Sequence, residues 1–235
     1  VRRRELHARH AALLESAGGA APELLAHHHA AAGAAARATA LWIEAASRAR
    51  LRCAFSEALA HLHAALDEAR RIADADASAA RALEAQLLLA ATLLMQRGPH
   101  VPEVAEALVV AHERATARGD DRALFQASWG LYINAASNLR LDAAREYGEE
   151  LSRISTRLGD NDLEMEALHH RWGICYFTGD VAGMLKGTSE GVARYDPVRH
   201  HRFAHVFAGH DSGVCAHVVS SIGWAMCGCA SPMRQ

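Results

Sequence analysis

The chain has 235 residues, of which 51% are apolar and 6% aromatic, with a formal net charge of −2 and an isoelectric point near 6.8. This length allows one or two domains with a sizeable core, and the near-neutral charge argues against binding nucleic acid through bulk charge. The first residues lack the apolar segment of a signal peptide. The most apolar stretch, around Leu87 to Met95, is shorter than the ~20 residues of a membrane span. We therefore expect a soluble protein without a membrane or nucleic-acid partner.

Residue usage also predicts the cellular setting. Alanine and arginine are in excess, and Lys186 is the only lysine, which indicates the codon bias of a GC-rich bacterial genome. Disulfides are rare in reducing compartments, and the cysteines here show no framework spacing. We expect a cytoplasmic protein in which all of them are free: Cys53, Cys175, Cys215, Cys227 and Cys229.

Apolar residues recur every three or four positions, which is the helical period, and predict helices of roughly 12 to 20 residues. Strand-favouring residues are sparse before residue 200, and glycine or an Asp/Asn cap marks most of the breaks. Short loops between long helices favour antiparallel neighbours. The predicted breaks fall at 18–22, 33, 53–54, 74–77, 98–100, 119–121, 138–140, 159–161, 179–180 and 196–197.

Breaks spaced by roughly 20 residues per helix indicate a helical-hairpin repeat. The segment from Leu41 to Asp67 fits the tetratricopeptide (TPR) pattern, in which a bulky residue and small residues alternate at set positions. Two later segments, around Trp129 and around Trp172, follow the same plan more loosely. The positions that carry the first match are Trp42, Ala46, Phe55, Ala58, Leu62 and Ala65.

These features predict an all-α fold in which antiparallel helical hairpins stack as a TPR-like right-handed superhelix. We expect a linker helix at residues 1–20, a TPR-like repeat domain at 21–226 and an irregular tail at 227–235. The incomplete appearance of the array predicts self-association through an exposed terminal repeat, because a repeat without its neighbour exposes apolar surface.

Four segments carry a family resemblance: 22–33 (PELLAHHHAAAG), 40–67, 129–151 and 194–216, the last containing RYDPVRHHRFAHVFAGHDSGVCA. Together with Trp224, they resemble the C-terminal TPR-like region of large bacterial multidomain regulators. In that family an AAA-like, STAND-type ATPase module precedes the repeats. Many members also carry a class III adenylate/guanylate cyclase domain, and others a DNA-binding domain. The resemblance covers about residues 20 to 226.

The resemblance implies a non-catalytic protein-interaction or regulatory module in signal transduction. Its partner would be a protein or peptide segment in a concave groove, or the module's own upstream ATPase domain. The tail CGCASPMRQ does not continue the helical pattern, so the chain has the appearance of a fragment. Two alternatives stay open: a cyclase, ATPase or ATP-binding transcriptional-regulator activity inherited from the parent protein, and a truncated gene fragment without independent function.

No catalytic or cofactor site is predicted. A phosphate-binding loop needs Gly-Lys-Ser/Thr at a strand-to-helix turn, whereas Lys186-Gly187-Thr188 has the reverse order inside a helical pattern. No serine or cysteine has an evident base at informative spacing. We therefore predict that this chain is not an enzyme and holds no cofactor.

The 16 histidines raise the question of a metal site. Consecutive histidines such as 27–29 diverge around a helix by about 100° per residue and do not converge on one ion. The best cluster is His205, His210, Asp211 and Cys215, for which the preferred interpretation is a helix cap by Asp211 or Ser212 beside a buried cysteine. Cys227 and Cys229 are interpreted as thiols of the tail. The sequence-based prediction is therefore no metal.

First helices of successive repeats line the concave groove of such arrays. Their aromatic residues are expected to lie mainly in the core, because large aromatic side chains dominate core energetics, although some could face a partner. The candidate groove or partner contacts are Trp129, Tyr132, Arg140, Arg171, Trp172 and Tyr176.

Overall fold

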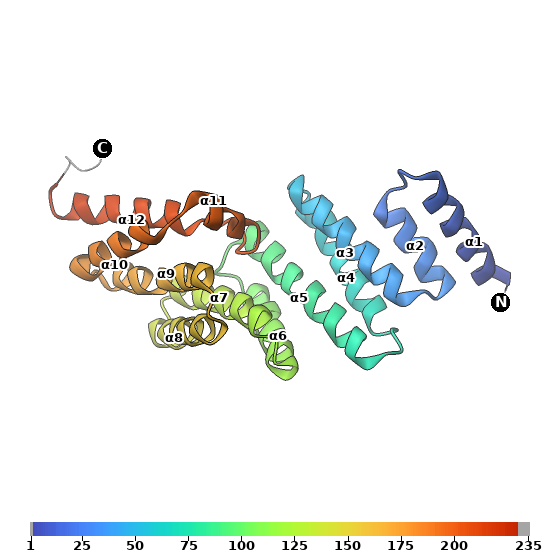
Figure 1. The fold of residues 1–235 in the computed structure, drawn as a ribbon, viewed down its shortest axis with the longest axis horizontal. Helices are drawn as coiled ribbons and strands as arrows, with labels where there is room; N and C mark the ends of the chain where they lie inside the picture. Colours follow the sequence, from blue (N-terminus) through green and yellow to red (C-terminus); the bar gives the residue numbers. More distant parts are fainter. Residues whose placement is uncertain (1, 230–235) are drawn as a thin grey trace. The chain divides into compact units, whose positions relative to one another are not determined.

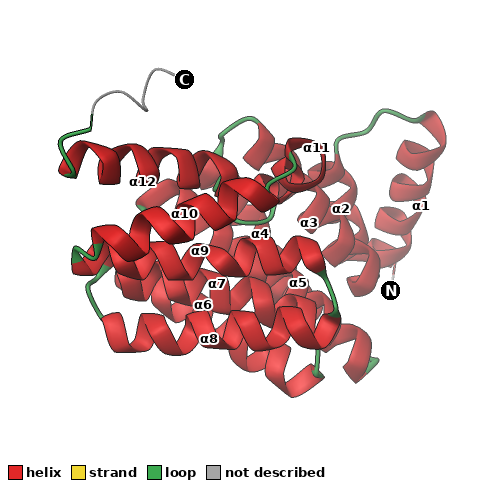
Figure 2. Cartoon of the chain, turned by 60° about the vertical axis from the view of Figure 1, so that its left-hand side comes forward, coloured by secondary structure: helices red, strands yellow, loops and turns green. Residues whose placement is uncertain are grey.

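The computed structural model describes residues 2–229, and all regular structure in that range is helical (Figure 2). The predicted all-α class is therefore confirmed. The described helices are α1 (Arg2–Ala17), α2 (Pro22–Ala32), α3 (Ala35–Leu51), α4 (Phe55–Ala69), α5 (Ala75–Arg97), α6 (Pro102–Arg118), α7 (Asp121–Ser137), α8 (Leu141–Leu158), α9 (Asn161–Thr178), α10 (Val181–Arg194), α11 (Pro197–His200), the 3-10 helix η1 (His201–His205) and α12 (Ser212–Met226).

The chain forms two compact units, one ending at Gln96 and one beginning at Arg97. Within each unit, most helices that follow one another pack against each other through short turns, as antiparallel hairpins do (Figure 1). In the second unit α7 also contacts α9, and α9 contacts α12, so some helices that are not consecutive in the chain are in contact as well. This is the stacking expected of a helical-hairpin repeat.

One turn geometry recurs between the helices. At each of several turns, the amide of the residue just before the next helix donates to a carbonyl five residues earlier, as in Asp120 to Ala115 (3.1 Å), Arg140 to Ala135 (2.9 Å) and Asp180 to Cys175 (2.9 Å). The residue before it has a positive φ, which is the left-handed conformation of a Schellman C-cap. The predicted breaks therefore correspond to a repeated local structure.

Aspartates cap several helices of the second unit. Asp120, Asp160 and Asp180 precede α7, α9 and α10, and each carboxylate accepts a hydrogen bond from a backbone amide of the first helical turn. Such caps satisfy amide donors that have no partner inside the helix. The GD and GDxD turns in the sequence thus combine a glycine that ends one helix with an aspartate that starts the next.

The first unit contains the segment that best fits the repeat pattern. Ala46, Ala58, Leu62 and Ala65 are fully buried between α3 and α4. Trp42 is partly buried, where it packs on a cluster of Leu25, Ala26 and Leu41 and stacks on His61 with ring centroids 5.3 Å apart. The small positions allow close helix approach, and the tryptophan covers the junction with the preceding helix.

Helix α5 has 23 residues, which makes it longer than the sequence predicts, and an 18-residue window within it has a mean hydropathy of 1.2, which would suit a membrane span by length and composition. Its ends are tied to α4: Ser78 Oγ donates to the Ala69 carbonyl (2.8 Å) and Gln96 Nε2 donates to Ser56 Oγ (3.0 Å). The polar side chains of Gln86 and Thr92 are buried within it. Such contacts are typical of a core helix in a helical stack.

The second unit is built around Trp172, which is fully buried on α9. Met165, Leu168 and Ala216 form one cluster with it, and Tyr195 packs against that cluster. Helix α12 therefore packs into the same core as α9, even though the short α11 and η1 intervene in the chain.

The predicted domain limits remain a prediction. Helix α1, placed in a linker, packs on α2. Helix α12 ends at Met226, where the tail was expected to begin. Of that tail, residues 230–235 lie outside the described residues.

Leu139 offers a test of the recurring turn. It has a φ of 57° in the α7–α8 turn and is 66% exposed. A side chain in the left-handed region costs about 1–2 kcal/mol, part of which is offset by the greater freedom of an unfolded glycine. Leu139→Gly should therefore raise the free energy of unfolding by roughly 0.5–1 kcal/mol, measured by urea denaturation.

Gly119→Ala is the reciprocal control, because Gly119 has a φ of 63° and no atom within 4 Å of an added Cβ. It should lower the free energy of unfolding through backbone strain alone. A destabilising Leu139→Gly would contradict this account of the turn.

Candidate functional site

Three of the six candidate partner contacts lie in the core. Trp129, Tyr132 and Trp172 are 3%, 1% and 0% exposed. The core interpretation of these aromatic residues therefore holds for all three. A partner at the surface would not touch their side chains, and their contribution to any site is to position other groups.

Arg140 stabilises a turn. Its guanidinium donates a hydrogen bond to the side-chain oxygen of Asn134, whose own amide donates to the carbonyl of Pro99. Asn134 is buried, so these bonds satisfy a polar side chain that would otherwise be costly to bury. The Arg140 side chain thus makes a structural contact at the turn between α7 and α8.

Tyr176 and Arg171 lie at the surface near the end of α9. Tyr176 is 43% exposed and contacts the edge of Phe177. The Arg171 side chain is 57% exposed and lies 3.9 Å from Glu190, at the limit of an ion pair. Of the six candidates, Arg171 is the one that lines a described cavity.

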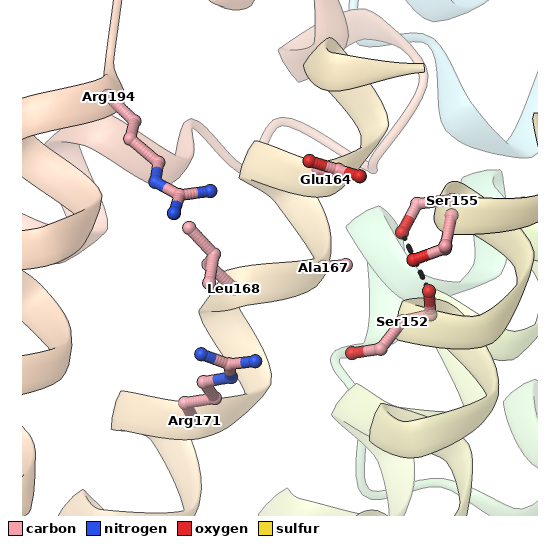
Figure 3. Close-up of a pocket in the computed structure, with 8 residues that line it drawn as sticks. Ser152, Ser155, Glu164, Ala167, Leu168, Arg171 and Arg194 are labelled. Atoms are coloured by element: carbon pink, nitrogen blue, oxygen red, sulfur yellow. Dashed lines mark hydrogen bonds between the residues drawn. The ribbon is translucent and has the colours of Figure 1, made fainter. Parts of the chain in front are cut away.

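That cavity, which we call the arginine pocket, lies against α8, α9 and the end of α10 and has a volume of about 190 Å³. Figure 3 shows the side chains of Arg171 and Arg194 on either side of Leu168, with serines of α8 on the opposite wall. The lining residues are Ser152, Ser155, Thr156, Glu164, Ala167, Leu168, Arg171 and Arg194.

The pocket has the chemistry of a small anion-binding surface. It holds two guanidinium groups against the single carboxylate of Glu164. Ser152 and Ser155 donate their hydroxyl protons to the backbone carbonyls of Gly148 and Ser152, at 3.3 Å and 3.1 Å. No histidine lines it, so neither serine has an imidazole base there. Two guanidinium groups beside serine hydroxyls suit the binding of a small anion.

A second polar group surrounds Glu166, in the middle of α9. The carboxylate is 2% exposed, and its Oε1 accepts a hydrogen bond from Trp129 Nε1 at 2.8 Å. His210 Nδ1 lies 3.2 Å from the same oxygen. The residues of this buried network come from α7, α9 and the segment that precedes α12.

The network continues to a cysteine. The His210 ring stacks on His169 of α9 with centroids 4.3 Å apart, and His169 Nε2 lies 3.4 Å from Cys215 Sγ in the first turn of α12. Ligand atoms of His169, His210 and Cys215 all lie within 4.8 Å of one another. We call these three residues the His-Cys cluster.

The pKa values of the two imidazoles are shifted in opposite directions. Burial, reinforced by the neighbouring His210 and His170, holds the pKa of His169 well below its ordinary value, so this ring is neutral at pH 7. Burial also opposes charge on His210, but the adjacent Cys215 and Glu166 outweigh it and raise the pKa of His210 to about 10.

The sequence located this region only in part. The predicted cap is confirmed: Asp211 accepts from the amide of Val214 at 3.0 Å, and α12 begins at Ser212. The sequence-based cluster paired His210 and Cys215 with His205 and Asp211, whereas the structure places His169 beside them. His169 and Glu166 were missed because they are more than 40 residues away from His210 and Cys215 along the chain.

A third group lies on the first two helices. His28 of α2 faces His7 and His10 of α1, and the Nδ1 atoms of His7 and His28 are 2.9 Å apart. The prediction that residues 27–29 diverge is compatible with this, because the neighbouring histidines come from another helix. The two Nδ1 atoms pair with each other, and the group is not among the convergent ligand sets of the described residues.

Asp162 anchors the segment that carries His210. Its carboxylate lies near the first turn of α9 and accepts hydrogen bonds from Arg199 and from Arg202, the latter at 2.9 Å. The side chain of Asp162 is 11% exposed, whereas both arginine side chains are more than half exposed. This ion pair holds α11 and η1 on α9.

No protein-family model matches the chain, and no curated protein matches it either.

Asp162→Ala should loosen residues 197–210. Hydrogen bonds to charged groups contribute about 1.5–3 kcal/mol, so amide hydrogen exchange in this segment should accelerate by roughly tenfold or more. Asp142→Ala is the control, because Asp142 is 98% exposed and pairs with Arg145 within one helix. Unchanged exchange across residues 197–210 in the Asp162 variant would contradict the anchoring role.

Proposed function

We propose that this chain is a non-catalytic TPR-like module that binds an acidic segment of a protein partner, with the arginine pocket as a principal contact. The observation that carries the proposal is the pairing of Arg171 and Arg194 around a small cavity on stacked helical hairpins. Guanidinium groups bind carboxylates through directional, charge-assisted hydrogen bonds. A stack of hairpins supplies a rigid surface on which such contacts are fixed.

The size of the pocket favours a protein segment over a free small molecule. Pockets for drug-sized ligands and cofactors have volumes of about 300–1,000 Å³, whereas this one has about 190 Å³. It therefore suits one acidic side chain or a chain-terminal carboxylate. Tyr176, which is 43% exposed at the end of the same helix, offers an additional contact to a longer segment.

The family resemblance supports a regulatory setting for such binding. In a bacterial signalling ATPase or nucleotide cyclase, the module would recruit a cytoplasmic protein or dock on the ATPase domain of its own chain. Either role needs recognition and transmission rather than chemistry in this segment. Enzymatic activity would then belong to other domains of the parent protein.

The apolar face of α12 supports a second, self-associating contact. Val214, Val218, Ile222 and Met226 recur every four residues and are 61%, 53%, 37% and 61% exposed. This spacing places them along one side of a helix. Contiguous exposed apolar surface of this kind marks interaction sites, and we propose that α12 pairs with a second copy of the chain.

Removal of either arginine should weaken binding of an acidic peptide. With a fluorescent poly-glutamate peptide as the probe, Arg171→Ala and Arg194→Ala should each raise the dissociation constant about tenfold, as expected when a charge-assisted bond is lost. The measurement is fluorescence anisotropy at low and high salt, and the matched poly-glutamine peptide should bind much more weakly.

Arg153→Ala is the charge-matched control. Arg153 lies on α8, pairs weakly with Glu149 and does not line the pocket. If all three variants weaken binding equally, the pocket is not the contact. Binding of ATP tighter than binding of the acidic peptide would favour a nucleotide-related function instead.

Val218→Glu should convert an associating chain into a monomer, because a charge in the middle of an apolar contact is costly to desolvate. Sedimentation velocity at several protein concentrations measures the change. Val109→Glu, at a valine of α6 that is 42% exposed, is the matched control and should leave association intact. A parent chain that is monomeric at all concentrations would refute this contact.

A further inference from the structure

The His-Cys cluster has the composition and spacing of a metal site. Two imidazoles and one thiol place their ligand atoms within 4.8 Å of one another. Around a tetrahedral Zn²⁺ ion, bonds of about 2.0–2.3 Å place ligand atoms roughly 3–4 Å apart. The His169 Nε2 to Cys215 Sγ distance of 3.4 Å already falls in that range. Small side-chain rotations would close the remaining distances.

The protein leaves polar atoms of this cluster without partners. Among the described residues, His210 Nε2 and His169 Nδ1 are buried and have no hydrogen-bond partner. Buried polar groups are almost always satisfied, and an unsatisfied one costs about 1–3 kcal/mol. His169 itself is 6% exposed. A cation coordinated by His210 Nε2 would satisfy one of these atoms directly.

Glu166 completes the arrangement expected around a metal-binding histidine. Imidazole ligands commonly donate their second N–H to a carboxylate, which fixes the orientation of the ring. His210 Nδ1 lies 3.2 Å from Glu166 Oε1, so its Nε2 is the nitrogen left for coordination. Trp129 holds the same carboxylate oxygen from the other side at 2.8 Å. Glu166, itself held by Trp129, thus fixes the orientation of the His210 ring.

We propose that His169, His210 and Cys215 bind a Zn²⁺ ion, with water in the fourth position. Thiolate and imidazole are ligands that Zn²⁺ prefers, whereas Mg²⁺ and Ca²⁺ prefer oxygen. Cys215 is only partly buried and follows the exposed Val214, which gives the ion a route from solvent. The ion would link the first turn of α12 to the middle of α9.

Cobalt is the spectroscopic probe for this site. The other cysteines are first replaced in the full chain by Cys53→Ser, Cys175→Ser, Cys227→Ser and Cys229→Ser, so that Cys215 is the remaining thiol. This protein should bind one equivalent of Co²⁺ with tetrahedral visible bands and a thiolate-to-cobalt charge-transfer band, and Zn²⁺ should displace the cobalt. Adding Cys215→Ser should abolish the charge-transfer band.

The roles of His169, His210 and Glu166 are tested by measuring the affinity of variants for Zn²⁺. His169→Gln and His210→Gln should each weaken binding of Zn²⁺ at least tenfold, and Glu166→Gln should weaken it about 10–100-fold. His217→Gln is the control, because His217 is exposed on the same helix as Cys215. Far-UV circular dichroism confirms that each variant is folded before its affinity is compared.

Alkylation of the unmodified chain gives an independent readout that does not depend on any variant. One equivalent of Zn²⁺ should slow the reaction of iodoacetamide with Cys215 at least tenfold while leaving the exposed Cys53 unaffected, as measured by peptide mass spectrometry. A charge-transfer band that survives Cys215→Ser, equal zinc affinity in the His210→Gln variant, or a Cys215 that zinc does not protect would overturn the proposal.

Discussion

The arrangement of the second unit depends on a buried carboxylate. Glu166 sits in the middle of α9 with 2% of its surface exposed. A carboxylate is costly to remove from water unless donors replace its hydration. Those donors come from Trp129 on α7 and His210 before α12, which are far apart in sequence. The burial of one side chain therefore couples three separate segments of the unit.

The hydrogen bonds to Glu166 also show what Trp129 and His210 do in the core. Trp129 uses its indole N–H inside the core, and its ring packs against Phe207 and His210. The Nδ1 atom of His210 lies against Glu166, and the same ring belongs to the His-Cys cluster. Trp129, expected mainly as a core residue, thus also supports an internal polar site, while Arg171 and Arg194 line the pocket at the surface.

The helix boundaries follow from local chemistry and were predicted almost completely. A glycine with positive φ and an aspartate cap act within one turn, so a single segment such as Gly159-Asp160 is enough to locate them. The break at 138–140 was also predicted. Its left-handed residue is Leu139 rather than a glycine, so the residue type alone did not indicate that conformation. The Glu166–His210 contact joins residues 44 positions apart, and no local pattern specifies which buried groups meet.

Close packing explains why the later repeats match the TPR pattern poorly while still stacking as hairpins. At Gly173 an added Cβ would clash with the hydroxyl oxygen of Tyr132, and at Gly213 it would lie 2.6 Å from the ring of Tyr195. In each case the glycine leaves space on the surface of its helix, and an aromatic ring from another segment packs there. The requirement is therefore a small residue opposite a large one across an interface. That complementarity can be met by different positions in each repeat, so the packing persists where the spacing of the motif does not.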